Sequence, residues 1–323
     1  MSAGMRTYVR ELVRRVPQLA PDVRFLPFGT GDNFGLDEQL RLPLAIARMR
    51  PRLVHFPAPF VPLLLPKRFV ITIHDLIELE FPQYSKPHAV WYYRNVIGRA
   101  ARRARAVITD DERTRALLID AFRLQPARVR VIALGATAFA AAPAAAPRAR
   151  PYLLYAGNHR PHKDLPTLFA AWHALPAGSG VDLVLTGRDD FNGSLERYRR
   201  DDARIDVIGD VPEVVLAALY AGALAYVHPA LSEGFGLPML EAMLAGAPVI
   251  ASENAIPRVL HAHAVTYPAG DSSALRAALE RALVRSTEDD LRLGAARRVA
   301  QTLTWERCAQ ATIGVYRDVM ATR

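Results

Sequence analysis

The sequence predicts an α/β protein built from two doubly wound halves, each a parallel sheet flanked by helices. Throughout the 323 residues, short apolar segments typical of buried strands alternate with longer segments typical of helices with one charged face. A chain of this length has room for two domains, each with its own core. Residues 131–147 carry no charge, are mostly alanine with two prolines, and are typical of a linker between the halves.

The elements follow in chain order. In the first half the expected strands are residues 53–56, 69–73, 106–109 and 129–134, and the expected helices are 4–16 and 94–105. In the second half the expected strands are residues 152–156, 181–186, 205–208, 224–227 and 248–251. Its expected helices are residues 165–173, 214–221, 237–245, 273–284 and 288–302. We therefore expect one domain at residues 1–140 and a second at residues 150–302.

The start of the chain departs from this pattern. A doubly wound half normally opens with a strand and a glycine turn, whereas this chain begins at Ser2-Ala3-Gly4, already at the turn. We therefore expect the first strand to be missing or the start codon to have been assigned too late. Ligands of such sheets bind beyond the carboxyl ends of the strands, and here also in a cleft between the halves.

Composition excludes several classes of protein. The single cysteine, Cys308, rules out an internal disulfide framework and fits a reducing compartment. The arginine-rich start, residues 1–16, lacks the apolar core of a signal peptide. No run approaches the roughly 20 apolar residues of a membrane-spanning helix. We therefore expect a cytoplasmic protein.

The positive charge is concentrated in the first half. Residues 1–150 hold 24 Lys and Arg against 12 Asp and Glu, whereas residues 151–323 hold 17 against 20, which together give the net charge of +9. A basic half favours an anionic partner, either a membrane surface or nucleic acid. No zinc-finger spacing, RNA-binding signature or long basic run supports nucleic acid. The alternative is a solvated surface from an arginine-favouring genome, because only three residues are lysines.

A glycine-containing loop in the second half has the features of a phosphate site. The strand at residues 224–227 leads into a loop that holds Gly234 and Gly236, and Pro238 then stands in the first turn of a helix, where proline is favoured. Gly246 ends that helix. The two glycines therefore precede a helix N-terminus, where backbone N–H groups and the helix dipole favour a phosphate.

Two glutamates frame this loop. Glu233 and Glu241 stand with seven residues between them. Glu233 is placed to accept hydrogen bonds from hydroxyls, whereas Glu241 lies one turn inside the helix. Glu241 could instead simply complement the positive end of the helix dipole, and the whole run could be a tight turn from strand to helix.

Residues 232–241, Ser-Glu-Gly-Phe-Gly-Leu-Pro-Met-Leu-Glu, closely resemble the retaining glycosyltransferases of family 4. Those enzymes have the GT-B fold, two facing Rossmann-like domains with a C-terminal helix that crosses back to the first, here expected within residues 303–323. Glu233 and Glu241 match the family's E-x7-E element. The resemblance implies that Glu233 holds sugar hydroxyls and that Glu241 binds the ribose. It also implies that the backbone amides of Phe235-Gly236-Leu237 bind the donor diphosphate or sugar.

A second loop, Tyr155 to Leu165, follows the first strand of the second half. A pair of basic residues near a glycine turn suits a diphosphate leaving group, whose negative charge grows as the glycosidic bond breaks. The family has a similar G-x-x-x-P-x-K-(N/D)-L stretch, which implies that Lys163 meets the phosphates, with Arg160 as a looser match. We assign Asn158 to the same donor loop. Without the resemblance, Lys163 could equally be an exposed lysine.

The apolar strand at residues 69–73 delivers His74 to its carboxyl end, the edge where ligands bind. A single histidine there is more often structural. The segment Thr72-Ile73-His74-Asp75-Leu76 resembles the family segment whose histidine lines the donor sugar, which implies that His74 stands beside the reacting sugar and that Asp75 holds the loop. His74 need not be a general base, because retention in this family is thought to proceed on one face of the sugar with help from the leaving phosphate.

Three further segments resemble the family more weakly. Gly4 resembles the glycine of the first loop, which approaches the diphosphate. Thr186-Gly187 and Gly209-Asp210-Val211, each at the end of a strand, match positions that flank the donor nucleotide, with Val211 near the base.

The carboxylates of the sequence show no metal-binding motif. No D-x-D triplet is present, so a metal-bridged diphosphate is not expected, and no cysteine–histidine cluster offers a zinc site. Four aspartate pairs are interpreted as turns and solvated helix ends: Asp110-Asp111, Asp189-Asp190, Asp201-Asp202 and Asp289-Asp290. The chain departs from the family at Pro257-Arg258, where a proline-glutamate is common, and at residues 109–112, where a serine-rich loop is usual.

We expect a metal-independent retaining glycosyltransferase. By resemblance to bacterial mannosyltransferases of surface-polysaccharide synthesis, the donor is expected to be GDP-mannose, with UDP-sugars and dTDP-rhamnose open, and the acceptor a lipid-linked or growing saccharide. The first domain should bind the acceptor and the second the donor. The expected location is the inner face of the cytoplasmic membrane, without nucleic acid as a partner. Candidate contacts to an anionic surface are Arg48, Arg50, Arg52, Lys67, Arg68, Arg99, Arg102 and Arg103.

Two alternatives remain open. The first is a nucleotide-sugar epimerase or a phosphorylase on the same fold, although the additional carboxylates and second histidine of an epimerase cannot be located in the sequence. The second is a non-catalytic scaffold protein of a polysaccharide complex, which would bind no nucleotide sugar.

Overall fold

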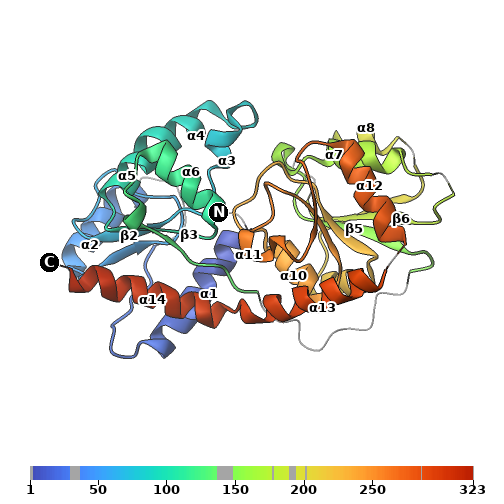
Figure 1. Cartoon of the computed structure of the whole chain (residues 1–323). Coiled ribbons are helices and arrows are strands. Elements are labelled where there is room, and N and C mark those ends of the chain that lie inside the picture. Colours follow the sequence, from blue (N-terminus) through green and yellow to red (C-terminus); the bar gives the residue numbers. More distant parts are fainter. Residues whose placement is uncertain are drawn as a thin grey trace. The chain divides into compact units, whose positions relative to one another are not determined.

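The computed structural model describes residues 3–29, 37–136, 148–176, 178–188, 194–200, 202–284 and 286–322. It divides into two compact units (Figure 1). The first unit is Met1–Gly135 with Leu303–Arg323, and the second is Ala136–Thr302. Most of the expected linker, residues 137–147, lies outside the described residues, as do Asp189, Asp190 and Asp201.

The first unit contains a parallel sheet of four strands in the order β1-β2-β3-β4. The strands are β1 (Val54–Phe56), β2 (Phe69–Thr72), β3 (Ala106–Thr109) and β4 (Val129–Val131). Every residue of β2 and β3 is buried, as expected for parallel strands with both faces covered. Within the described residues, no strand precedes β1.

Strand β4 is shorter than the predicted 129–134. The amide of Ile132 still donates to the Thr109 carbonyl oxygen at 2.8 Å, after which the chain leaves the sheet. It then passes close to the start of the last helix: a Cβ on Gly135 would lie 2.1 Å from the backbone nitrogen of Trp305. Strand β4 ends where its partner β3 ends, since Val131 lies opposite Thr109, and the close backbone approach explains why a glycine stands at position 135.

Helices cover this sheet. They are α1 (Ala3–Leu19), α2 (Leu42–Met49), α3 (Ile77–Glu80), α4 (Pro87–Tyr92), α5 (Gly98–Arg103), α6 (Glu112–Phe122) and α14 (Trp305–Ala321). Short π-helical turns, Asp37–Arg41 and Tyr93–Ile97, and 3₁₀ turns, Pro82–Tyr84 and Pro126–Arg128, complete the unit. The last helix, expected near residues 305–320, packs against α1 in the first unit (Figure 1).

The helix predictions in this unit were incomplete. The helix predicted at residues 94–105 begins earlier, because Pro87 opens a helical run that continues through the π-turn to Arg103. Helices α2 and α3 were not predicted, and neither was α6. Helix α6 begins after Asp111, whose carboxylate accepts from the Arg113 amide at 2.8 Å and so caps the helix.

The second unit contains a parallel sheet of six strands in the order β10-β9-β8-β5-β6-β7. The strands are β5 (Tyr152–Ala156), β6 (Asp182–Thr186), β7 (Ile205–Gly209), β8 (Ala225–His228), β9 (Val249–Ser252) and β10 (Val265–Tyr267). Strand β10 was not predicted. Successive strands run outward from β5 in one direction and from β8 in the other, so β5 and β8 form the switch point of the sheet, where ligands of such folds bind.

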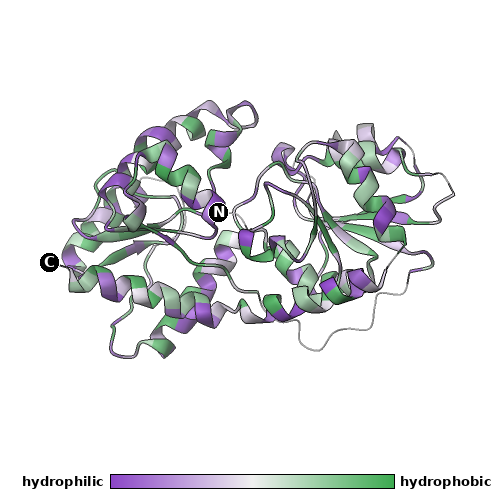
Figure 2. Cartoon of the chain, in the orientation of Figure 1, coloured by the Kyte–Doolittle hydropathy of each residue, from purple (hydrophilic) through white to green (hydrophobic). Residues whose placement is uncertain are grey.

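Helices flank this sheet as well. They are α7 (Leu165–His173), α8 (Ser194–Arg199), α9 (Glu213–Gly222), α10 (Leu237–Ala245), α11 (Arg258–His261), α12 (Ser272–Leu283) and α13 (Thr287–Thr302). Asp289 and Asp290 lie in the first turn of α13, as the sequence predicted. Figure 2 shows that the strands of both units are largely hydrophobic, whereas the helices contain both hydrophobic and hydrophilic residues.

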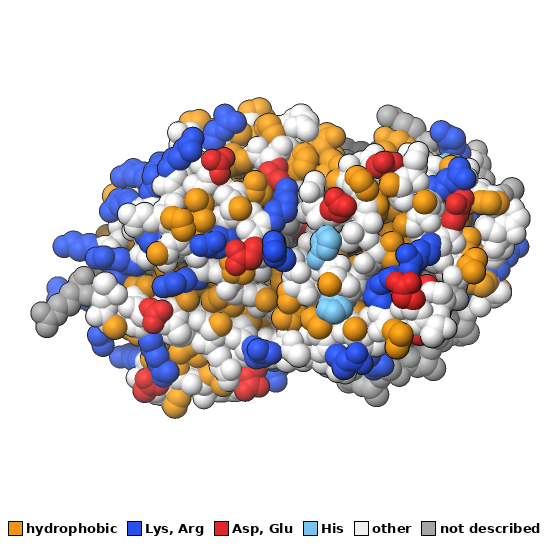
Figure 3. All heavy atoms as spheres, in the orientation of Figure 1, with side chains coloured by type: hydrophobic (Ala, Val, Ile, Leu, Met, Phe, Trp, Pro, Cys, Tyr) orange, Lys and Arg blue, Asp and Glu red, His pale blue; other side chains and the backbone are white. Residues whose placement is uncertain are grey.

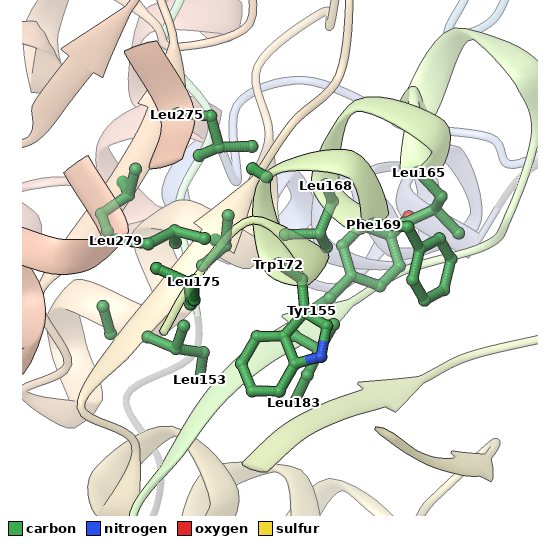
Figure 4. Packing of buried hydrophobic residues seen from close by; sticks show 14 of the residues in the cluster. Leu153, Tyr155, Leu165, Leu168, Phe169, Trp172, Leu175, Leu183, Leu275 and Leu279 are labelled. Carbon is green, nitrogen blue, oxygen red and sulfur yellow. The ribbon is translucent and has the colours of Figure 1, made fainter. Parts of the chain in front are cut away.

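The core of the second unit lies between β5 and helices α7 and α12 (Figure 4). Trp172 of α7 is fully buried and packs in one cluster with Leu153 of β5 and Leu275 of α12. Its indole Nε1 donates to Asp202 at 3.2 Å, so the polar atom of this large side chain is satisfied. The packing holds β5 firmly, and β5 carries the loop that contains Asn158 and Lys163.

The prediction of two α/β units, each a parallel sheet flanked by helices, is confirmed. Within the part of the chain that the structure describes, no helix is both long enough and apolar enough to cross a membrane.

Candidate active site

The loops after β5 and β8 meet at the switch point of the six-stranded sheet. The loop after β5 carries Asn158 and Lys163, and the loop after β8 carries Glu233. The backbone joins them directly, because the Leu231 amide donates to the His162 carbonyl oxygen at 2.7 Å. Two motifs that lie about 70 residues apart in sequence therefore form one site.

Lys163 and Glu233 form an ion pair at the centre of this site. The Lys163 ammonium donates to Glu233 Oε2, and the two side chains are only 11% and 19% exposed. The imidazole Nε2 of His228, the last residue of β8, lies 3.3 Å from the same carboxylate oxygen. On its other side, His228 Nδ1 lies 2.8 Å from the Tyr226 hydroxyl. The carboxylate thus has the Lys163 ammonium as its hydrogen-bond partner and an imidazole nitrogen close by.

The surroundings keep Glu233 ionised and His228 neutral. Burial raises the pKa of the Glu233 carboxyl, but Lys163 and His228 outweigh burial and hold this pKa far below its usual range. Burial lowers the pKa of His228. It also lowers the pKa of the adjacent His162 to about 4, with Lys163 as the second cause. At neutral pH the site therefore contains one carboxylate and one ammonium, flanked by uncharged imidazoles.

Gly236 is the N-cap of α10, in the left-handed conformation with φ of 71°. A Cβ there would lie 2.1 Å from Cε of Met239, so a side chain would require Met239 to shift and would also strain the left-handed backbone. Gly246 ends the same helix at φ of 89°, as the sequence predicted. The loop before α10, including Gly234 and Phe235, is buried, while Leu237 is half-buried at the first helical position.

Neighbouring strands bring further predicted residues to the same edge. Gly187 comes directly after β6 with φ of 99° and lies against the loop that follows β5. A Cβ on Gly187 would lie 2.0 Å from the Gly157 carbonyl oxygen. Its amide donates to the Gly209 carbonyl oxygen at 2.8 Å, which joins the β6 and β7 loops. Thr186, Gly187 and Asn158 therefore lie at one edge, while Val211 stands half-buried just before α9.

Asn158 and Arg160 differ in their surroundings. Among the described residues, the side-chain oxygen Oδ1 of Asn158 is buried without a hydrogen-bond partner. A buried acceptor left unpaired costs about 1–3 kcal/mol, which fits a position that a ligand donor would satisfy. Arg160 is exposed on the loop.

Glu241 lies one turn inside α10, as predicted, and faces α9. Its carboxyl group lies beside the Tyr220 side chain. Burial, with a smaller contribution from Glu213, raises its pKa to about 7. Glu241 is therefore poorly solvated as an anion, unlike Glu233, which has a cationic partner.

In the first unit, His74 follows β2 and pairs with a residue that follows the neighbouring strand β3. His74 Nδ1 lies 2.6 Å from Oδ2 of Asp110, and both side chains are at least 90% buried. Nε2 lies 3.2 Å from the Pro57 carbonyl oxygen. Burial lowers the pKa of His74, but the Asp110 carboxylate outweighs burial and the net shift is upward. With an acceptor at each nitrogen, His74 is suited to donate both N–H groups.

The interpretation of Asp110 as part of a turn or a solvated helix end was therefore wrong. Asp111 caps α6 as such an interpretation expects, but Asp110 is only 2% exposed and faces the sheet edge. The adjacent carboxyl ends of β2 and β3 place His74 and Asp110 together. A charged residue directly after an apolar strand, at the same edge as His74, is the signal that could have identified it.

His74 also belongs to a larger buried network. The Tyr8 ring contacts the His74 ring edge-on, with centroids 4.8 Å apart. The Tyr8 hydroxyl lies 3.1 Å from Thr72 Oγ1, which lies 2.8 Å from His55 Nε2. Nδ1 of His55 lies 2.6 Å from the Tyr316 hydroxyl. Helices α1 and α14 thus fix the environment of the strand that carries His74.

Gly4 lies in the first turn of α1, at the beginning of the described residues. Its contact with a diphosphate stays a prediction. The functional candidates that the sequence analysis did not single out are Asp110 and His228. The signal for His228 was its position as the last residue of a buried strand that leads into the glycine loop. Among the described residues, no group of three or more His, Cys, Asp or Glu could hold a metal ion.

Comparison with known proteins identifies the family. The model "Glycosyltransferase Family 4" matches residues 6–138, and "Glycosyl transferases group 1" matches residues 150–285. The two matches correspond closely to the two units. The chain belongs to glycosyltransferase family 4. It is therefore a glycosyltransferase, and its two units have the GT-B fold.

Relatives and solved structures agree with this assignment. O-antigen chain mannosyltransferase B of Escherichia coli is 28% identical over 84% of this chain and 76% of its own length. A GDP-mannose-dependent alpha-mannosyltransferase of Mycolicibacterium smegmatis is 30% identical over 55% of this chain, but the match spans only 46% of that protein. The Anabaena protein HepE, solved with UDP-glucose, superposes with a TM-score of 0.75 at 16% identity, covering 98% of this chain and 97% of that chain.

Proposed function

We propose that this glycosyltransferase retains the anomeric configuration and transfers a hexose, mannose from GDP-mannose, to a lipid-linked or polysaccharide acceptor. The observation that carries the proposal is the Lys163–Glu233 pair at the switch point of the six-stranded sheet. An ammonium and a carboxylate side by side provide complementary partners for a diphosphate and for sugar hydroxyls. The names of the E. coli and M. smegmatis relatives favour mannose as the sugar.

Donor binding in this proposal exchanges one set of partners for another. The diphosphate takes the Lys163 ammonium and the amides of Phe235-Gly236-Leu237 at the start of α10, where the helix dipole also favours negative charge. Glu233, released from Lys163, accepts hydrogen bonds from sugar hydroxyls. The unpaired Asn158 oxygen accepts a donor from the ligand. Arg160, Thr186, Gly187 and Val211 complete the proposed donor site, with Glu241 at the ribose.

The first unit is proposed to bind the acceptor and to supply His74. A His74 that donates from Nε2 stabilises negative charge rather than accepting a proton, which agrees with a role beside the reacting sugar and not as a general base. Leaving-group charge in the proposed reaction is neutralised by Lys163, Arg160 and the start of α10, without a metal ion. We also propose a peripheral position at the inner face of the cytoplasmic membrane, for which the basic first half of the chain is the support.

The donor is tested by thermal unfolding of the full chain in the presence of GDP-mannose, UDP-glucose and dTDP-rhamnose. GDP-mannose at 100 times its dissociation constant should stabilise the protein by about 2.7 kcal/mol. Glu233→Gln should remove most of this stabilisation, whereas Glu253→Gln, a change at an exposed position in the same unit, should retain it. Stabilisation by none of the three donors would favour a non-catalytic scaffold protein.

A second arm tests the proposed chemistry of charge neutralisation. Transfer activity should be unchanged by EDTA if Lys163 and the α10 N-terminus neutralise the leaving diphosphate. Loss of activity in EDTA, with recovery on adding Mg²⁺ or Mn²⁺, would contradict a metal-independent reaction.

A further inference from the structure

A cavity of about 520 Å³ opens in the first unit, at the amino ends of three of its strands. Lys67 precedes β2, Arg105 precedes β3, and Arg128 and Arg130 flank the start of β4. The carboxyl ends of α5 and α14 complete the walls, and Val315 and Val319 supply apolar surface. The volume lies within the range of cavities that hold small molecules.

The lining of this cavity is strongly basic. Its basic residues are Lys67, Arg102, Arg103, Arg105, Arg128 and Arg130. Asp318 is the one carboxylate among the described residues that line it. Figure 3 shows Lys and Arg side chains gathered over this end of the unit, near α5 and the C-terminus.

Two of these cations have partners within the protein. Arg128 donates to the carbonyl oxygens of Arg102, at 2.9 Å, and Ala104, and so closes the carboxyl end of α5. This contact also occupies carbonyls whose negative ends would otherwise repel an anion. Arg130 lies 4.0 Å from Asp318.

The remaining four have no such partner in the part of the chain that the structure describes. Lys67, Arg102, Arg103 and Arg105 lie within 4.0 Å of no described carboxylate. Four like charges around one cavity repel one another, and an anion bound among them would relieve that repulsion. Guanidinium groups present paired N–H donors that match phosphate oxygens, and three of the four are arginines.

We propose that this cavity binds a phosphate group of a ligand, either the headgroup of an anionic phospholipid or a soluble phosphorylated compound. The site is separate from the transfer chemistry. Lys67 stands at the amino end of β2 and His74 at its carboxyl end, roughly 20 Å apart along an extended chain. Occupation of the cavity therefore places no phosphate at His74 and does not depend on the donor site of the second unit.

The test measures arginine accessibility residue by residue in the full-length chain. Phenylglyoxal modification is followed by peptide mass spectrometry in the presence of inorganic pyrophosphate, of phosphatidylglycerol-containing vesicles, or of pure phosphatidylcholine vesicles. A phosphate ligand should slow modification of Arg102, Arg103 and Arg105 by about tenfold, because each contact is a charge-assisted hydrogen bond. Exposed Arg94 and Arg123, which do not line the cavity, should react unchanged.

The two phosphate sources give different patterns. Protection by pyrophosphate alone identifies a soluble ligand, and protection by phosphatidylglycerol vesicles alone identifies a lipid headgroup; either supports the proposal. No protection by either probe would overturn it, as would equal protection of Arg94 and Arg123, since that outcome means diffuse surface charge.

Paired variants provide an independent measurement. Arg103→Gln with Arg105→Gln should weaken binding of the protecting probe by about tenfold. Arg94→Gln with Arg123→Gln removes the same charge from exposed positions elsewhere in the unit and should weaken it less than about twofold. An equal effect of the two pairs would contradict a defined site. Both pairs should leave donor-induced stabilisation of the second unit unchanged.

Discussion

At the scale of single residues, the proposed donor site depends on the Lys163–Glu233 ion pair and on His228 beside it. The pair is largely buried, and each ion depends on the other for its solvation. This arrangement keeps the carboxylate ionised in the absence of ligand, while the neutral His228 contributes a nearby nitrogen without a second positive charge. A ligand with both anionic and hydroxyl groups can satisfy both ions.

The first prediction concerns this pair. Lys163→Met should destabilise the protein by about 3 kcal/mol near pH 7, because Glu233 would remain buried without its ammonium. Adding Glu233→Gln should restore most of that loss, since the uncompensated charge is then removed. Chemical denaturation of the wild-type protein, both single variants and the double variant measures the coupling. A double variant as unstable as the sum of the two single variants would contradict the interaction.

The second prediction concerns His74 and Asp110. Asp110→Asn should lower the pKa of His74, because burial alone then acts on the imidazole. A raised pKa contributes stability that is fully present below the unfolded value of about 6.5 and is lost as pH rises through the folded value. The variant should therefore lose about 2 kcal/mol at pH 6 and less at pH 9.

The matched control is Asp120→Asn, in the same unit but at an 83% exposed side chain. NMR titration of the His74 ring, with denaturation at both pH values, makes the measurement. An unchanged His74 pKa in Asp110→Asn would show that the carboxylate does not control the imidazole.

At the scale of elements, helix α10 connects the glycine loop to the core. Gly236 and Gly246 both have positive φ at the two ends of this helix, but only Gly236 faces an obstructing atom, Cε of Met239. Gly246→Ala should cost about 1 kcal/mol for the left-handed conformation alone. Gly236→Ala should cost more, because Met239 must also move, and thermal denaturation of the two variants compares them directly. Equal losses would show that Met239 moves without cost.

Glu241 in the same helix predicts a pH dependence. Its pKa of about 7 lies above the unfolded value near 4.5, so the folded state binds the proton more tightly and stability falls as pH rises between those values. The contribution amounts to about 3 kcal/mol between pH 5 and pH 8. Glu241→Gln should remove this fall and raise the melting temperature at pH 8 relative to the wild type. A variant that keeps the wild-type pH dependence would contradict the assignment to Glu241.

Element prediction from sequence succeeded where one strong local signal was present. The apolar strands and the helix from Pro238 to Gly246 have such signals, and apart from the early end of β4 the structure contains them within one or two residues. Strand β10 was missed although it is as long as β1 and β4, which were predicted. The helices that were missed are α2, α3, α6, α8 and α11. Their positions depend on packing against the rest of the unit.

Site prediction had a similar limit. The E-x7-E pattern and the loop after β5 were recognisable separately, but the contact between Lys163 and Glu233 follows from the order of strands in the sheet. Asp110 was misinterpreted because two adjacent aspartates resemble a solvated turn. Only the pairing of β2 with β3 shows that one of them faces His74.

At the scale of the whole molecule, the two units carry different charge and different chemistry. The first unit holds the buried His74–Asp110 pair at the carboxyl edge of its sheet and a basic cavity at the opposite edge. The second unit holds the ion pair and the glycine loop that support a nucleotide-sugar site. The family assignment rests on both units, because each is matched by its own family model.

The central claim is retaining transfer from a nucleotide sugar held by the Lys163–Glu233 site. The most direct test is NMR assignment of the anomeric configuration of the product formed from GDP-mannose and a lipid-linked saccharide acceptor, with wild-type protein and Glu233→Gln in parallel. We expect an α-linked mannose from the α-linked donor, and a large loss of product with Glu233→Gln. A β-linked product, or full activity of Glu233→Gln, would contradict the mechanism.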